Sequence, residues 1–248
     1  MNQRTIFCLF VAAISSYFST PIYAQSSTKD EIHLIQSFFQ DASLNSGPYG
    51  EIGLNYLDYE NGSIFDVGVQ GGIPIASKFD LSTGLHFQSI NPEGDLDGES
   101  GIADIPIYGR YLIVSQQNFK VSGGAYLTLP VGSEDIGWGN TNFGFFGATR
   151  YGVSNQVTLT GTLGLDFLEV GDDRETSLNL GFGSIIGVTN ELNIIPEFLF
   201  QTETEYLALS GGVDYKISSM GHLRGVILLG LDDGAPDLGV GGAFLFEF

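Results

Sequence analysis

The residues of this chain that could carry out nucleophilic or acid–base chemistry are three histidines, His33, His86 and His222. A hydrolase would need one of them beside a nucleophilic hydroxyl and a third group that orients the imidazole ring. The three histidines are far apart in the sequence, and none lies in a recognisable catalytic motif. The sequence therefore predicts that the chain is not an enzyme, and that His86 and His222 are polar residues of the interior.

A second candidate for chemistry is the acidic segment NPEGDLDGES (91–100), in which Asp95, Asp97 and Glu99 surround Gly98. Calcium and magnesium prefer such oxygen ligands, but the spacing is not that of an EF-hand loop. The glycine repeat GFGSIIG (181–187) has no βαβ unit around it, so it does not predict a dinucleotide site. We expect no cofactor, and we interpret 91–100 as a solvated loop. Whether it bridges divalent cations to lipopolysaccharide is left open.

A third set of residues is charged and alternates with apolar neighbours, which places its members on one face of extended segments. These residues are Asp66, Asp104, Arg110, Lys120, Arg150, Asp166, Glu197, Asp214 and Arg224. Enclosed bases must pair with acids or with water. The set is therefore either a salt-bridge network that fills an interior or a polar pathway whose acids disfavour anions.

The elements that would position these charges alternate between apolar and polar residues almost from end to end. We predict strands at 50–60, 64–76, 79–90, 103–114, 119–130, 141–152, 156–169, 176–188, 191–202, 205–217 and 222–232, and a closing segment that ends at Phe248. Most are roughly 11–14 residues long, whereas globular strands average about 5–6. A tilted strand needs about 9–11 residues to cross an outer membrane. Length and number favour a membrane barrel over a sandwich.

The connections between these segments alternate in length. Short turns are expected at 76–78, 115–118, 154–156, 189–191 and 218–221, and longer or more acidic loops at 91–100, 131–139, 170–176, 202–205 and 232–237. Outer-membrane barrels combine short periplasmic turns with longer outer loops. The predicted fold is all-β, a transmembrane antiparallel up-and-down barrel of about 12 strands that occupies residues 50–248. A free sheet edge is costly in hydrocarbon, so the closing segment must pair with the first strand.

The composition agrees with this fold and excludes other classes. The net charge is −20, yet the mean hydropathy is +0.14, with 35 Gly, 19 Phe and 11 Tyr. A disordered acidic chain would be poor in aromatic residues. No basic patch is present to bind phosphates, so nucleic acid is not an expected partner.

The N-terminal part is expected to direct export. Arg4 precedes the short apolar run IFCLFVAAI, and Ala24 offers a small residue for cleavage, so residues 1–24 are predicted to be a signal peptide. Cys8 would leave with it. Residues 25–49 are predicted to form a periplasmic or lumen segment, and the mature chain to reside in the outer membrane of a Gram-negative bacterium.

Three segments also suggest a family. GLDDGAPDLGVGGAFLFEF (230–248), GIADIPIYGRYLIV (101–114) and GAYLTLPVGSEDIGWGNTNFGFFGATRY (124–151) resemble outer-membrane proteins grouped under the meta-pathway of phenol degradation. The resemblance spans most of 50–248. It implies a transporter-like barrel for hydrophobic or aromatic compounds, and it carries no binding residues over to this chain.

From these observations we expect a barrel that passes small hydrophobic or aromatic solutes passively. The alternatives are a non-transporting structural or adhesion barrel with a filled lumen, and a rim lipid hydrolase. Expected partners are small hydrophobic solutes, outer-membrane lipid and lipopolysaccharide, and the barrel-assembly machinery, which would bind the C-terminal strand ending in Phe248.

Overall fold

The protein was analysed as a computed structural model, which describes residues 29–94, 97–133, 136–137, 139–170, 173–219 and 221–248. The predicted signal peptide, its cleavage near Ala24 and Asp95 of the acidic segment lie outside these residues.

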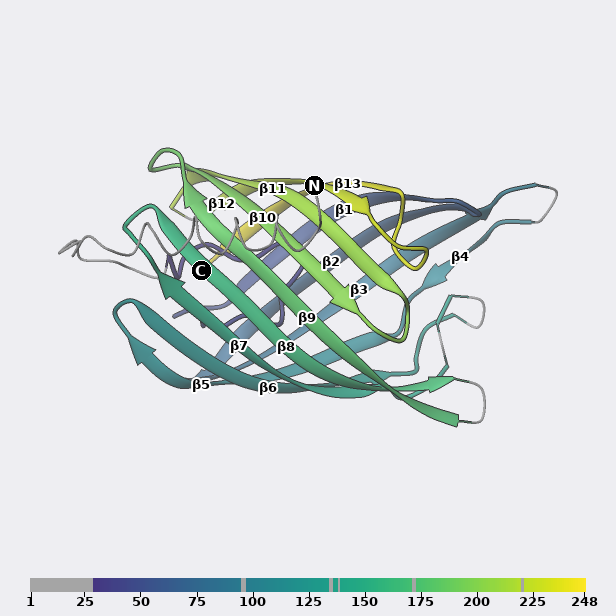
Figure 1. Cartoon of the computed structure of the whole chain (residues 1–248), viewed down its shortest axis with the longest axis horizontal. Helices are drawn as coiled ribbons and strands as arrows, with labels where there is room; N and C mark the ends of the chain where they lie inside the picture. The colour runs from purple at the N-terminus through teal and green to yellow at the C-terminus, as the bar shows by residue number, and fades with distance from the viewer. Residues whose placement is uncertain (1–28, 95–96, 134–135, 138, 171–172, 220) are drawn as a thin grey trace, which may run out of the picture.

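The described chain forms one closed antiparallel barrel (Figure 1). Its strands are β1 (Tyr49–Tyr59), β2 (Gly62–Ala76), β3 (Phe79–Pro92), β4 (Glu99–Ile102), β5 (Ile105–Gln116), β6 (Phe119–Leu129), β7 (Phe143–Gly152), β8 (Val157–Val170), β9 (Asp173–Gly187), β10 (Leu192–Gln201), β11 (Tyr206–Ser218), β12 (Gly221–Gly230) and β13 (Leu238–Glu247). Apart from β4, each strand pairs with the next one around the wall, and β13 closes the wall against β1 from Tyr49↔Glu247 to Asp58↔Leu238. The predicted barrel of about 12 strands is confirmed. The additional short strand, β4, pairs with β3 from Phe87 to Ile90, and β5 pairs with β3 from Phe79 to Thr83.

The alternation of side chains explains why these segments form a membrane wall. In β1, Ile52 and Leu54 point outward and are 50% and 52% exposed. Glu51, the residue before Ile52, points inward and is 8% exposed. The same contrast recurs around the wall, where outward-facing Val, Leu, Ile and Phe side chains form an apolar surface. In a bilayer these side chains contact hydrocarbon, while the strand hydrogen bonds satisfy the backbone. Among the described residues, no helix is long and apolar enough to cross a membrane.

The connections differ in detail from the sequence-based prediction. Strands β8 and β9 continue to Val170 and from Asp173, so the loop expected at 170–176 is mostly paired strand. The acidic segment 91–100 is shortened because β4 begins at Glu99 and pairs with β3. These extended hairpins project beyond the rest of the wall at one end of the barrel, which we call the outer end; the opposite end has the short turns (Figure 1).

Residues 29–48 form no helix or strand and lie inside the barrel; we call them the plug. Two small apolar clusters fix the plug to the wall. In one, Ile32 and Leu34 pack with Ile185 of β9 and Ile195 of β10. In the other, Phe38 packs with Tyr49 and Leu245. The interior core of this barrel is therefore built largely on the plug.

A charge placed on the outer wall should destabilise the barrel. We predict that Leu54→Arg, near the middle of β1, lowers the free energy of unfolding in lipid by about 2–4 kcal/mol, because an arginine near the bilayer midplane loses its hydration. Urea unfolding of the protein in phospholipid vesicles measures the change. Glu60→Arg, in the exposed β1–β2 turn, is the control and should cost less than about 1 kcal/mol. Equal effects of the two substitutions would contradict the assignment of this wall to lipid.

Candidate functional site

The plug is held first by two like charges of the wall. Lys120 of β6 and Arg150 of β7 are directly opposite each other in the strand register. Such a pair is unfavourable unless anions intervene. The plug provides them: Asp30 Oδ2 lies 2.6 Å from the Lys120 ammonium, and both oxygens of Asp41 accept hydrogen bonds from the Arg150 guanidinium. Arg150 is fully buried, and it also donates to the plug carbonyls of Lys29 (2.7 Å) and Ile32 (2.6 Å).

A second arginine ties the plug to the start of the barrel. Arg110 of β5 donates through Nε to Asp80 Oδ1 of β3 (3.1 Å), its cross-strand neighbour. It also donates to the Tyr49 hydroxyl (3.1 Å) and to the carbonyl of Asp41 (3.3 Å). The side chain has no exposed surface. Arg110 therefore joins β3, β5, β1 and the plug in one network.

A third arginine holds the first part of the plug. Arg224 of β12 forms an ion pair with Glu51 of β1 and donates to the carbonyls of His33 (2.7 Å) and Leu34 (2.9 Å). A second carboxylate, Asp214 of β11, lies 3.4 Å from Arg224 Nε. Main-chain carbonyls of the plug thus accept hydrogen bonds from all three of these buried arginines, Arg110, Arg150 and Arg224.

One wall carboxylate has the converse arrangement. Glu197 of β10 is 4% exposed, and it accepts hydrogen bonds from three successive plug N–H groups, those of Ile35 (3.0 Å), Gln36 (2.9 Å) and Ser37 (3.0 Å). Backbone amides that converge on an anion in this way form a nest. The plug therefore provides carboxylates where the wall is cationic and N–H donors where the wall is anionic.

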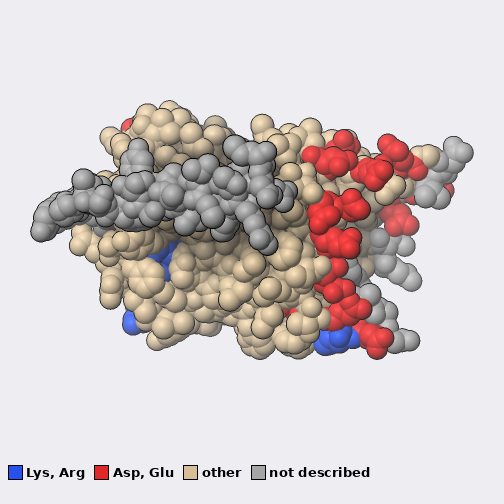
Figure 2. Space-filling model, viewed as in Figure 1, with Lys and Arg blue, Asp and Glu red and all other residues tan. Residues whose placement is uncertain are grey.

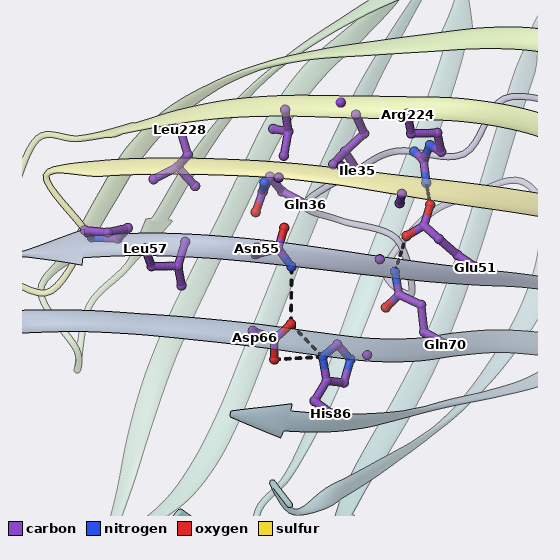
Figure 3. A pocket seen from close by; sticks show the side chains of 18 of the residues that line it. Ile35, Gln36, Glu51, Asn55, Leu57, Asp66, Gln70, His86, Arg224 and Leu228 are labelled. Carbon is purple, nitrogen blue, oxygen red and sulfur yellow. Dashed lines mark hydrogen bonds and ion pairs between the residues drawn. The ribbon is translucent and has the colours of Figure 1, made fainter. Parts of the chain in front are cut away.

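On the outer side of the plug, a cavity of about 370 Å³ lies between the plug and strands β1–β3, β12 and β13. Figure 3 shows its polar wall, where Asp66 accepts hydrogen bonds from Asn55 (3.2 Å) and from His86 Nδ1 (3.0 Å). Apolar side chains, among them Leu57 and Leu228, line the cavity beside these polar groups. The cavity can accommodate a small molecule with one polar and one apolar face.

A second cavity of about 330 Å³ lies beside β5, β6 and β8–β10, and Gln36 and Tyr206 line both cavities. Its aromatic wall is a stack in which the Phe39 and Tyr108 ring centroids are 4.7 Å apart and those of Tyr108 and Tyr126 are 5.1 Å apart. Asp166 of β8 and Asn179 of β9 also line this cavity. We call the two cavities the β1 chamber and the β8 chamber.

Acidic side chains surround the entrance to both chambers. Figure 2 shows them in a band at the outer end. This acidic rim consists of Asp58, Glu60, Glu93, Asp97, Glu99, Asp173, Glu203, Glu205, Asp232, Asp233 and Asp237, all exposed. Among the described residues of this end, the positive charge comes from Arg174, whose Nη2 lies 3.1 Å from Glu169 Oε2. Such a field attracts cations and repels anions. Among the described residues, no group of three or more His, Cys, Asp or Glu side chains is arranged to hold a metal ion.

The structure places eight of the predicted lumen residues inside the barrel. Lys120, Arg150 and Glu197 contact the plug, as do Arg110 and Arg224; Asp214 lies beside Arg224; and Asp66 and Asp166 line the chambers.

Asp104 is different, because it lies between β4 and β5, where its Oδ1 accepts a hydrogen bond from the Gly132 N–H (2.9 Å). It therefore holds the β6–β7 loop instead of lining a chamber.

Other interior residues were missing from the predicted set. Glu51 and Asp80 follow the same alternation as the predicted residues, so that pattern could have identified them. Asp30 and Asp41 lie in a segment without alternation, and nothing in the sequence pairs them with Lys120 and Arg150.

The histidines occupy three different environments. His86 pairs with Asp66 in the β1 chamber, His222 Nδ1 lies 2.7 Å from Asp214 Oδ1, and His33 is a plug residue. The hydrogen-bond partners of the two wall histidines are thus carboxylates. This arrangement gives the rim-hydrolase alternative no specific support.

Comparisons with known proteins agree with this architecture. The family model described as "Putative MetA-pathway of phenol degradation" matches residues 49–248. Among solved structures, the KdgM porin is similar with a TM-score of 0.58 and 12% identity, covering 80% of this chain and 99% of its own. The NanC porin has a TM-score of 0.55 and 8% identity, covering 82% and 99%. The toluene transporter TbuX of Ralstonia pickettii has a TM-score of 0.49 and 7% identity, covering 83% and 90%. The comparison with curated proteins gave no match.

The closed wall, the apolar outer surface and the occupied lumen define an outer-membrane β-barrel with an internal plug. The family match covers more than half of the chain, so the protein belongs to the phenol-degradation MetA-pathway family, as the resemblance of its sequence predicted.

The Arg150–Asp41 pair should be essential to the plug. We predict that Arg150→Met lowers the free energy of unfolding by about 3–5 kcal/mol, because it leaves a buried carboxylate without its partner. The double variant Arg150→Met/Asp41→Leu should recover part of this loss. Urea unfolding of the wild type, Arg150→Met, Asp41→Leu and the double variant gives the coupling free energy. The control is Arg174→Met, which breaks an exposed ion pair and should cost about 0–1 kcal/mol. Additive effects of the two single substitutions would show that the pair does not hold the plug.

Plug stability should also fall in mild acid. Burial lowers the pKa of His33 below its ordinary value of 6.5, although Glu247 opposes the shift. The Nε2 atom lies 2.9 Å from the Asn45 amide nitrogen, a contact that suits the neutral ring. Because the unfolded chain binds the proton more tightly, the contribution of His33 is complete above pH 6.5 and is lost progressively below it, toward the lowered pKa.

We therefore expect the free energy of unfolding to fall between pH 7 and pH 5, and to fall less in His33→Gln. Urea unfolding at pH 7, 6 and 5 measures both proteins. Since the two proteins differ only at residue 33, the difference between the two profiles isolates His33. Parallel profiles would contradict this role.

Proposed function

We propose that this barrel passes small hydrophobic or aromatic solutes passively across the outer membrane. The observation that carries the proposal is the pair of chambers on the outer side of the plug, each lined by apolar or aromatic side chains together with polar ones. Pockets of this size suit small organic molecules. The family description, which concerns phenol degradation, supports the same class of solute.

Passage requires the plug to move. In its bound position the plug lies across the lumen between the chambers and the periplasmic end, where it contacts β1, β5–β7, β10, β12 and β13. A solute would enter from the acidic rim, occupy a chamber and leave when the plug shifts. The absence of an energy-coupling motif from the sequence makes passive exchange the simplest mechanism.

The first alternative is a filled structural or adhesion barrel, and the dense plug contacts favour it. It predicts that solutes do not cross. Whether the barrel passes solutes or is filled, we further propose that its outer loops contact lipopolysaccharide. We also propose that the barrel-assembly machinery recognises β13 during insertion.

Uptake of radiolabelled toluene by intact Gram-negative cells tests the proposal, because the lipopolysaccharide leaflet slows apolar solutes that cross phospholipid vesicles unaided. Cells that produce the protein should take up toluene faster than cells that produce an unrelated outer-membrane barrel at the same level. Equal rates would support the filled barrel. Liposome swelling with sugars provides a second measurement, and we expect little swelling because the plug blocks a continuous water path.

Plug movement can be tested with a disulfide, since Cys8 is the chain's one cysteine and lies in the predicted signal peptide. A Cβ at Gly181 of β9 would lie 3.4 Å from the Ser37 hydroxyl of the plug. That separation suits a disulfide in Ser37→Cys/Gly181→Cys once the Thr162 hydroxyl has rotated away. We predict that toluene uptake is low in oxidised cells and recovers after reduction by dithiothreitol. Each single variant is the control. Unchanged uptake in the oxidised double variant would show that solutes bypass the plug.

A further inference from the structure

One buried carboxylate of the lumen lacks the partners that the others have. Asp166 is 6% exposed. Its Oδ2 accepts a hydrogen bond from the Asn179 amide, and its Oδ1 accepts none from the described residues. The Asn179 amide oxygen is also without a hydrogen-bond partner there. Two acceptor atoms that accept no hydrogen bond from the described residues therefore line the β8 chamber.

The other buried carboxylates show how unusual this is. Asp41, Asp80 and Glu51 each pair with an arginine. Asp66 and Asp214 each pair with a histidine, and Glu197 accepts three backbone N–H groups. Among the described residues, Asp166 has only neutral groups as neighbours that can donate to it, the Asn179 amide and the Tyr126 hydroxyl, and no cation. A buried carboxylate is costly unless it is paired, so this site favours a positively charged partner from outside the chain.

The wall around Asp166 suits an organic cation. Tyr126 lies next to it, because Gly144 of β7 pairs with both residues and leaves their side chains in contact range. Tyr126 continues the stack of Tyr108 and Phe39. The faces of aromatic rings attract cations, and they also stack with aromatic ligands. A ring that carries an ammonium group would satisfy both the aromatic wall and the free carboxylate oxygen.

The electrostatic environment of the entrance agrees. The acidic rim lies at the same end as the β8 chamber, and the wall bases Arg110, Arg150 and Arg224 are already paired with carboxylates. A cation would be attracted to the rim and would meet an unneutralised carboxylate in the chamber.

We propose that the β8 chamber is a binding site for small aromatic cations, in which Asp166 accepts a hydrogen bond from the ammonium group and Tyr126 and Tyr108 contact the ring. This inference rests on the proposed function and narrows it, because it names a charged class of solute for one of the two chambers. Asn179 positions Asp166 and provides the second acceptor.

Two probes of similar shape test the charge. Benzylammonium and benzyl alcohol both carry a ring and a hydrogen-bond donor, but benzylammonium alone is charged at pH 7. We expect the purified protein in detergent to bind benzylammonium about tenfold more tightly than benzyl alcohol, as measured by calorimetry. Equal affinities would overturn the proposal and indicate a site for neutral hydrogen-bond donors. Absence of benzylammonium binding would also overturn it.

Variants then locate the site. Asp166→Asn keeps the shape of the side chain and should abolish the preference for benzylammonium. Asp66→Asn, the matched change in the β1 chamber, should leave it unchanged. If Asp166→Asn does not fold, Asp166→Ser serves instead, because it also removes the charge and should also abolish the preference for benzylammonium. A preference that survives the loss of the Asp166 charge would contradict the assignment.

The toluene assay separates this inference from the proposed function. If toluene uptake occurs but the preference for benzylammonium is absent, the cation site is wrong and the passive barrel stands. If the cation binds at Asp166 but neither toluene nor benzylammonium enters cells, the chamber binds solutes and the transport function is wrong.

Discussion

The structure depends on the neutralisation of buried positive charge inside the barrel. Lys120 and Arg150 face each other across β6 and β7, and the wall places no carboxylate directly opposite either of them. A barrel with an empty lumen would have to hydrate both cations or separate them. Here the plug brings Asp30 and Asp41 to them, and the same few residues also bind Arg110 through the Asp41 carbonyl. The plug is therefore required by the charge of the wall, in addition to the apolar contacts that it makes.

This dependence explains how a chain of such acidity can form a compact interior. The acids divide into two populations with different surroundings. Those of the acidic rim are exposed and gain from hydration, while those of the lumen are buried and, apart from Asp166, paired. Buried ion pairs add little net stability compared with apolar contacts, but removal of one partner is costly. Such pairs specify one position of the plug more than they strengthen it.

The sequence predicted the wall well and the interior poorly, for a physical reason. A strand that contacts lipid on one face and water or polar groups on the other must alternate, so residues such as Ile52, Leu54 and Glu51 identify their own orientation. The extent of β8 and β9 was missed because polar residues beyond the membrane can pair as strands without an apolar face. The plug has no repeated environment, so its residues follow no period. The partners of Asp41 depend on a loop conformation that alternation does not encode. Asp104 does not point into the lumen, because it lies in the break between β4 and β5, where alternation no longer applies.

The unequal pairing of the lumen carboxylates connects the architecture to function. In the periplasmic half and the middle of the lumen, the buried carboxylates have arginines, histidines or backbone amides as partners. Asp166 lacks such a partner among the described residues, and it lies on the outer side beside a cavity. A barrel whose role was only structural would gain stability from a lysine or arginine at this position, since the wall elsewhere carries such bases. An unneutralised carboxylate beside three stacked rings, behind an acidic rim, is instead the arrangement expected where the missing charge arrives with a ligand.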